Sequence, residues 1–342
     1  MKRVFCVVLL AGPVMANDGF GGFSATGLTF GQTDQVAMET EDLMIGLDRI
    51  AVDYTFRTLG DTDVTGEVIF PLPPVPMGDL INGMWNLPED TDRENLIDFK
   101  AVVDGVPIKV QIDRLAVILP EAWWDLSSAA QYDTPGRDVT ALLAAHGMSV
   151  TLDGGKAWEE VNALPAAARD ALLAEGVIGD YDDGAGFDLY PNWSVVLRYH
   201  WTQTFKAGAV TKVHHDYENR PTGGVFGWED PPEQDYLKDI ARTYCIDAGT
   251  SKAIYKALAR PDAQDGAWGM AYNIDYVLRT ANSWAGPIGR FTLTLDKGEA
   301  RNVISLCADG VEKTGPTTFV VEKTDFTPDQ DLKILLVQPA GE

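Results

Sequence analysis

Histidine is scarce in this chain, so any histidine-dependent chemistry rests on a few positions. Residues 194–205 and 209–217 both read as strands, and the three residues between them suit a tight hairpin loop. Such a loop would place His200 opposite His214, with the two Cβ atoms about 5 Å apart. The histidines of the chain are His146, His200, His214 and His215.

A hairpin in this register would also bring a metal-binding set together. Asp216 lies two residues beyond His214, and two imidazoles with a carboxylate suit zinc or copper once a further ligand completes the set. The alternative is a solvated polar face, because Thr202 and Thr204 share it with His200. We favour the solvated face and predict no cofactor.

An acidic run offers oxygen ligands of the kind that calcium prefers. It does not match the twelve-residue loop of helix–loop–helix calcium sites, since Pro191 occupies the position of the last ligand. A solvated acidic loop is the alternative interpretation. The candidate calcium ligands are Asp180, Asp182, Asp183 and Asp188.

Aromatic side chains in predicted loops are candidate contacts for a partner. Exposed tryptophans anchor protein partners or stack on sugars, although most of the nine tryptophans are expected in the core. The candidates for such a binding role are Trp123, Trp124 and Trp228.

Common catalytic signatures are missing from the sequence. It has no Gly-x-Ser-x-Gly elbow, no phosphate-binding glycine loop, no His-Glu-x-x-His and no Cys-x-x-Cys. Its many carboxylates permit a glycosidase pair without indicating one. Whether the protein is an enzyme stays open at this point, and we lean toward a protein without catalytic activity.

The charge of the chain restricts its partners. The sequence carries 51 acidic and 27 basic residues, for a formal net charge of −24. Such a surface repels nucleic acid and anionic lipid, both of which are bound mainly through lysine and arginine. Solubility is the simplest role for the charge, and capture of cations or basic partners is the alternative. We predict no nucleic-acid partner, and the oligomeric state stays open.

The first sixteen residues have the pattern of a cleaved signal peptide. Lys2 and Arg3 precede a short apolar run, and small residues lead to Val14-Met15-Ala16. This pattern predicts cleavage after Ala16 and a periplasmic or secreted protein. The apolar run is too short to span a bilayer, which takes about 20 residues, and no later segment is apolar enough.

Cleavage would leave Cys245 and Cys307, because Cys6 lies within the signal peptide. One remaining pair in an exported chain predicts a disulfide. A pair of free buried thiols is the alternative.

Alternating apolar residues and turn signals predict a mainly β protein. Residues 49–56 alternate strictly, and the turn at Asp104-Gly105 separates two further strands. Residues 133–180 instead have an alanine-rich, helical composition. The expected fold is two antiparallel β-sandwich-like regions, with a helical segment between them and helices inserted in the second.

The predicted domain boundaries lie where the sequence changes between strand-like and helix-like patterns. After the signal peptide at 1–16 come a β-sandwich-like region at 17–132, a helical segment at 133–187 and a second β region at 188–342. The helical insertion of the second region covers residues 233–260.

Six stretches of the sequence carry a likeness to known proteins: residues 39–43, 70–73, 103–108, 201–205, 244–247 and 284–291. Together they resemble a family of exported bacterial proteins known as a domain of unknown function, DUF4424. The resemblance extends from about residue 25 to 337 and implies a periplasmic or secreted protein, without an activity, cofactor or catalytic residue. A second likeness, of residues 50–108, is to vault inter-alpha-trypsin-type sandwiches and implies an interaction module.

These observations predict a non-enzymatic binding or envelope-associated module. Its expected partner is an envelope protein or glycan. The alternative is a hydrolase or metal-dependent enzyme that acts on an envelope glycan or peptide.

Overall fold

The computed structural model describes residues 14–24, 27–80, 85–123, 126, 131, 136–182, 187–259 and 268–340. The helices are α1 (Met77–Leu80), α3 (Thr140–Ala145), α4 (Gly154–Asn162), α5 (Ala166–Ala174), α6 (Asp235–Thr243), α7 (Ala248–Leu258) and the 3₁₀ helix η2 (Arg279–Ser283). The strands of the first half are β1 (Val14–Ala16), β2 (Gly19–Ser24), β3 (Gly27–Phe30), β4 (Val36–Ile45), β5 (Arg49–Thr58), β6 (Val64–Pro71), β7 (Val75–Pro76), β8 (Lys100–Val103), β9 (Val106–Pro107), β10 (Gln111–Ile118) and β11 (Arg137–Asp138). Those of the second half are β12 (Ile178–Asp182), β13 (Phe187–Pro191), β14 (Ser194–Phe205), β15 (Val210–Glu218), β16 (Thr222–Gly227), β17 (Trp268–Val277), β18 (Ile288–Asp296), β19 (Val303–Leu306), β20 (Glu312–Lys313), β21 (Thr318–Phe326) and β22 (Leu332–Pro339).

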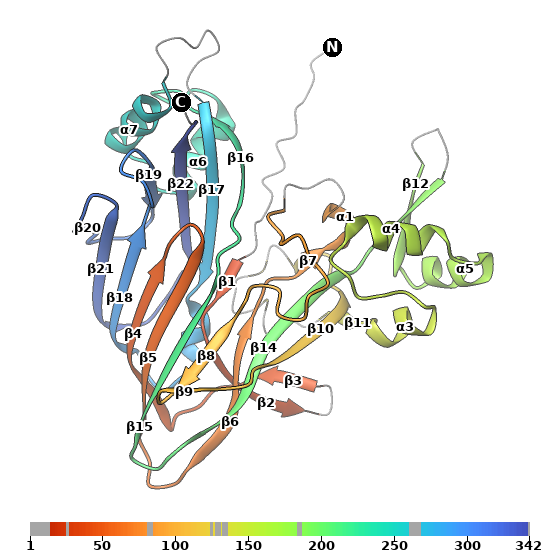
Figure 1. The fold of residues 1–342 in the computed structure, drawn as a ribbon, viewed down its shortest axis with the longest axis horizontal. Coiled ribbons are helices and arrows are strands. Elements are labelled where there is room, and N and C mark those ends of the chain that lie inside the picture. The colour runs from red at the N-terminus through yellow and green to blue at the C-terminus, as the bar shows by residue number, and fades with distance from the viewer. Residues whose placement is uncertain are drawn as a thin grey trace.

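Three mixed or antiparallel sheets form the body of the protein (Figure 1). Within the described residues, sheet C has eight strands in the order β20-β21-β18-β4-β5-β15-β8-β9. Sheet B has the order β11-β10-β14-β6-β2-β3, with β7 beside β14. Sheet A has the order β1-β17-β22-β19, with β16 beside β17. The mainly β, sandwich-like fold is therefore confirmed, and buried side chains of all three sheets belong to one hydrophobic core.

The alternation predicted for residues 49–56 is present in β5. Ile50, Val52, Tyr54 and Phe56 are buried, while the residues between them are exposed or half-buried. Successive side chains of a strand point to opposite faces, so one face of β5 enters the core and the other meets solvent.

The hairpin predicted for the two histidine-bearing strands is wrong, although the strands themselves are present. β14 pairs with β10 and β6 in sheet B, whereas β15 pairs with β5 and β8 in sheet C. The buried faces of the two strands oppose each other across the core, where the ring centroids of Trp201 and His215 lie 6.4 Å apart. The solvated face that we favoured for His200 is also wrong, because His200 is 2% exposed and β14 is buried on both faces over most of residues 194–201. The two strands are buried by the stacking of two sheets rather than by pairing with each other.

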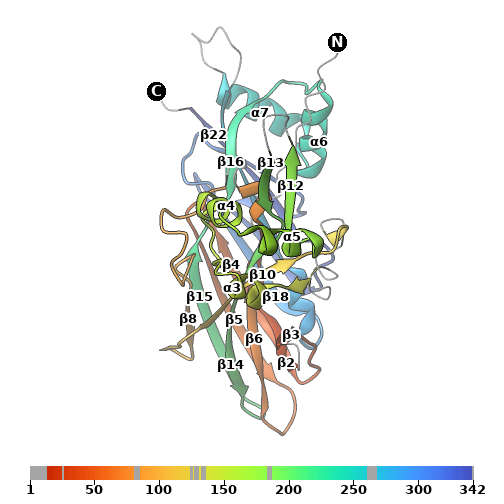
Figure 2. The same cartoon turned by 90° about the vertical axis from the view of Figure 1, so that its right-hand side faces the viewer.

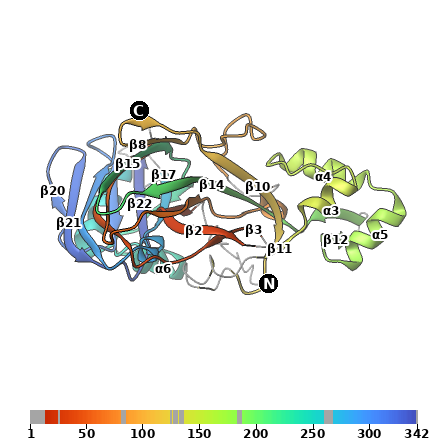
Figure 3. The same ribbon diagram turned by 90° about the horizontal axis from the view of Figure 1, so that it is seen from below.

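Helices are present in both segments that the sequence predicts to be helical, residues 133–187 and 233–260. α3, α4 and α5 lie with the β12–β13 hairpin at the end of the molecule away from β20 and β21 (Figures 1 and 3), and Figure 2 looks onto them. α6 and α7 lie inside the predicted insertion and cover the second face of sheet A through a separate apolar cluster around Trp228 and Leu335.

The predicted boundary between the two β regions does not separate two sheets. β4 pairs in parallel with β18, from the other end of the chain, in residue pairs such as Leu43 with Leu293. Sheet C thus contains strands from both predicted regions and joins them through one continuous backbone hydrogen-bond network.

The predicted disulfide between Cys245 and Cys307 is confirmed, with a Cα–Cα distance of 5.1 Å. Cys245 follows α6 and Cys307 follows β19, so the bond fastens the helical insertion to the edge of sheet A.

Removing this bond should destabilise the protein. The two cysteines are 62 residues apart, and the chain-entropy model assigns a loop of that length roughly 4 kcal/mol. We expect the double variant Cys245→Ser/Cys307→Ser to lose up to this amount in free energy of unfolding, measured by urea titration. The reduced native protein is the control, and equal stability of all three forms would contradict the expectation.

Candidate functional site

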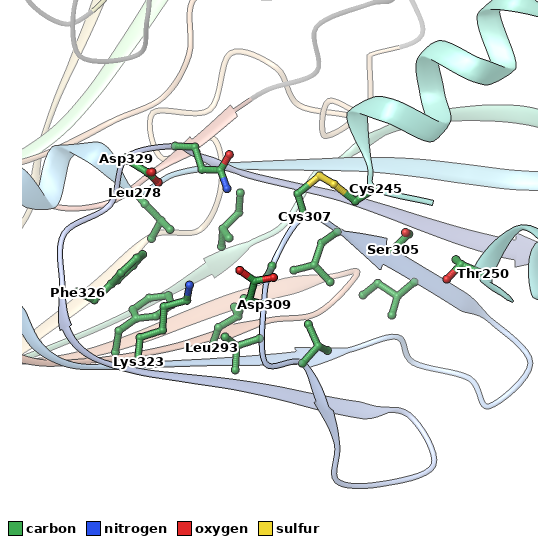
Figure 4. A pocket seen from close by; sticks show the side chains of 18 of the residues that line it. Cys245, Thr250, Leu278, Leu293, Ser305, Cys307, Asp309, Lys323, Phe326 and Asp329 are labelled. Carbon is green, nitrogen blue, oxygen red and sulfur yellow. A yellow bond between two sulfur atoms is a disulfide. The ribbon is translucent and has the colours of Figure 1, made fainter. Parts of the chain in front are cut away.

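A cavity of about 680 Å³ opens between the free ends of sheets A and C (Figure 4). Its walls come from β18 and β21 of sheet C and from β19 and the start of β22 in sheet A. β19 is a four-residue strand at the edge of sheet A. Because this edge strand is short, it covers only part of the inward face of β18 and β21.

Apolar side chains from both sheets line part of the cavity. Leu293 and Val321 are buried in sheet C, and Ile304 and Leu306 of β19 are half-buried opposite them. Ile304 and Leu306 point inward because they alternate with Ser305, whose hydroxyl donates to the Tyr244 carbonyl on the other face of the sheet (2.8 Å). A molecule in this space would replace water on apolar surface, which stabilises binding.

Charged groups gather at the mouth of the cavity. Lys323, Asp309 and Asp329 belong to its lining and are labelled in Figure 4. The Lys323 ammonium nitrogen lies 5.2 Å from the centroid of the Phe326 ring, within the range of cation–π contacts. The disulfide forms another part of the wall. Among the residues that the structure describes, the lining thus combines apolar side chains with the Lys323 ammonium group and the carboxylates of Asp247, Asp309 and Asp329, and it includes no histidine.

The structure brings together two of the three predicted metal ligands, since His214 Nε2 lies 4.0 Å from Asp216 Oδ1, but it places His200 in another sheet. His200 is buried in sheet B with its Nδ1 2.9 Å from Glu67 Oε2, whereas the half-exposed His214 lies in sheet C with its Nδ1 2.8 Å from Asp53 Oδ1. Asp216 forms an ion pair with Arg49. In the described part of the chain, no three His, Cys, Asp or Glu side chains are grouped to hold a metal ion.

The acidic run forms the β12–β13 hairpin instead of a long loop. Asp180 and Asp182 occupy alternate positions of β12, while Asp188 of β13 is paired with Tyr181 and is out of phase with them. Asp183 lies outside the described residues. The calcium site stays a prediction.

The tryptophans expected to be exposed are buried where the structure describes them. Trp228 is 3% exposed, stacks on Phe226 and donates from Nε1 to Ser251 Oγ at 3.0 Å. Trp123 is 6% exposed, and Trp124 lies outside the described residues. The prediction is wrong for the first two because their rings fill gaps between elements, where they remove more apolar surface from water than an exposed ring would.

A fully buried polar network was not predicted from the sequence. Its centre is the dipeptide Asn17-Asp18, which follows β1 and has no exposed surface. Asn17 Nδ2 donates to both carboxylate oxygens of Glu41 (3.0 and 3.1 Å), and Tyr54 donates its hydroxyl to Asn17 Oδ1. Asp18 Oδ2 lies 2.9 Å from His215 Nε2. Sheets A, B and C meet around these groups, so the network connects all three layers.

Burial perturbs the acid–base behaviour of this network. Loss of solvation raises the pKa of Glu41 from 4.5 to about 8, and the nearby Asp18 and Asp42 carboxylates add to the effect. The same loss of solvation raises the pKa of Tyr54 well above its usual value. Since none of these groups reaches solvent, the network supports the fold and is closed to a dissolved substrate.

A signal for the network was present in the sequence. Glu41 shares the inward phase of β4 with Leu43 and Ile45, and His215 shares that of β15 with Tyr217. A titratable residue in the apolar phase of a strand indicates a buried partner, because an unpaired buried charge is costly. The partner, Asn17-Asp18, could not be identified because it lies far away in sequence.

Comparisons with known proteins define the family. The chain belongs to the family described as Domain of unknown function (DUF4424), whose model matches residues 16–335. No curated protein matches it.

One similar solved structure is from Legionella pneumophila and is described as a "putative nutrient binding protein". Its sequence identity is 14% and its TM-score 0.46, over 95% of this chain and 71% of that one. This likeness is too loose to carry a statement about ligand or mechanism.

His215 and its neighbour His214 provide a matched test of the buried network. His215→Ala leaves Asp18 buried without its partner and should lower the free energy of unfolding by about 3–5 kcal/mol. His214→Ala, one residue away on the solvent face, should cost at most about 1 kcal/mol, because an exposed pair contributes little. Urea unfolding of both variants measures the difference, and equal losses would contradict the role of the network.

In a chain that keeps β1, Glu41 should make the free energy of unfolding depend on pH. The folded state holds the Glu41 proton up to about pH 8, whereas an unfolded glutamate releases it near 4.5. The folded state therefore binds more protons between these values, and the free energy of unfolding should fall as pH rises through them. Glu41→Gln should flatten this part of the profile, measured by urea unfolding at several pH values. An unchanged slope would show that Glu41 is ionised in the folded chain.

Proposed function

We propose that this protein is an exported, non-enzymatic binding module whose cavity between β18–β21 and β19–β22 takes a small amphipathic ligand. The proposal rests on the cavity, which is lined by apolar side chains from both sheets and by charged side chains. Its volume of about 680 Å³ lies in the range of small-molecule sites, roughly 300–1,000 Å³.

The chemistry of the cavity favours a ligand with an apolar body and a polar end that carries a positive charge or both charges. Leu293, Val321 and Leu306 would enclose the body. At the mouth, Asp309 would face a positively charged group of the ligand, and Lys323 would face a negatively charged one. The excess of acidic residues over the whole chain disfavours ligands with several negative charges.

Export is supported by the signal-peptide pattern of the first sixteen residues and by the disulfide, which persists in oxidising compartments. No helix in the described residues is long and apolar enough to cross a membrane. The proposed location is the periplasm or the extracellular medium.

Filling the cavity should abolish most binding. The test uses N-phenyl-1-naphthylamine, a neutral apolar dye whose fluorescence rises in apolar surroundings. Leu306→Trp places an indole in the cavity and should weaken dye binding roughly tenfold, which corresponds to about 1.4 kcal/mol. Fluorescence titration of the mature protein measures the dissociation constant.

The matched control is Val225→Trp, which adds the same ring at a position that is 77% exposed on the edge strand β16. It should leave dye affinity unchanged. Failure of the dye to bind the native protein, or equal affinity in both variants, would refute the cavity as the binding site. Thermal unfolding of both variants checks that each is folded.

A further inference from the structure

We propose that cleavage after Ala16 converts the backbone nitrogen of Asn17 into an α-ammonium group that stays inside the buried network, as the positive charge opposite Asp18 and Glu41. Such cleavage acts on the maturation of the fold and is independent of the cavity. It makes the first residue of the processed chain a central part of the core.

Asn17 is fixed by contacts that do not depend on the residues before it. Its side chain contacts Glu41, its carbonyl accepts from Thr280 Oγ1 at 2.8 Å, and its nitrogen donates to the Val277 carbonyl at 2.8 Å. The next residue is held through the Trp284 indole, which donates to the Asp18 carbonyl at 3.1 Å. These bonds survive removal of β1, which is attached to β17 by a short parallel pairing.

The network is poor in positive charge. Asp18 and Glu41 are its carboxylates and His215 is its basic side chain, while Tyr54, Tyr217 and Tyr276 are the other titratable groups that face it. Asp18 Oδ1 is buried without a hydrogen-bond partner in the described structure. A buried acceptor with no donor is costly, so the site favours one more donor.

Cleavage would supply that donor. Water adds its hydroxyl to the Ala16 carbonyl carbon as the Ala16–Asn17 amide bond breaks under a signal-peptide-cleaving protease. Ala16 leaves as a carboxylate, and the Asn17 nitrogen takes up two protons to become an ammonium group. One N–H keeps the bond to Val277, and two become available to other acceptors. The new charge would arise on the residue whose side-chain amide contacts Glu41 and which directly precedes Asp18, so we expect both carboxyl groups to interact with it.

The new ammonium group should in turn favour ionised Glu41. An opposite charge within about 4–6 Å stabilises a carboxylate. The fall in stability with rising pH, expected while β1 is attached, should therefore be smaller in the processed chain.

The first experiment measures the reactivity of the amine. The protein is exported from its host, and mass spectrometry identifies its N-terminus, which we expect to be Asn17. An amine-acylating reagent is then applied to native and to urea-unfolded protein, and labelling of the N-terminal peptide is compared with that of exposed lysines. The native Asn17 amine should react at least about tenfold more slowly than the unfolded one, because the reagent must wait for local opening.

The second experiment measures the coupling to Glu41. Glu41→Gln is introduced into the chain that starts at Asn17 and into a chain that starts at Val14, and all four proteins are unfolded in urea between pH 5 and 8 (roughly the window in which folded and unfolded Glu41 differ). The substitution should reduce stability more in the Asn17 chain than in the Val14 chain. A different natural N-terminus, equal amine reactivity in the folded and unfolded states, or equal effects of Glu41→Gln in both chains would each overturn the proposal.

Discussion

Desolvation of the Asn17-Asp18 network is the constraint on which the rest of the structure depends. Two carboxyl groups and a histidine have left water completely, and this is tolerated only if their partners are held in place. Those partners come from β4, β5, β15 and the η2 region, so misplacing any of these elements would leave a polar group without a partner. The network thereby favours one arrangement of the three sheets over other compact arrangements that bury the same apolar area.

The cavity follows from the same arrangement. Sheet C is long enough to pack against sheet B at one end and sheet A at the other. Sheet A ends at the short strand β19, so the inner face of β18 and β21 is left partly uncovered there. The rigid network and the open cavity therefore lie at different places in one continuous core, and a ligand could enter without disturbing the buried charges.

Sequence patterns predicted the elements better than their partners. The alternation of apolar residues in β5 correctly predicted its buried face, and the number of cysteines left after cleavage correctly predicted the disulfide. Alternation carries no information about which strand lies next to which, so β14 and β15 were wrongly paired and His200 was wrongly placed opposite His214. The burial of Trp228 depends on α7, and the importance of Asn17 depends on residues more than 20 positions away. These features belong to tertiary packing, which local pattern does not encode.

The parallel pairing of β4 with β18 has a consequence for the order in which the protein folds. β4 lies between β5, its neighbour in sequence, and β18, which is made about 250 residues later. Sheet C therefore cannot be completed until most of the chain has emerged, and before that β4 exposes an unpaired edge. A nascent chain with such an edge is prone to aggregate and has a high contact order, so its folding is expected to be slow and post-translational. For the export proposed above, delayed completion of the sheet would keep the chain unfolded and competent for transport.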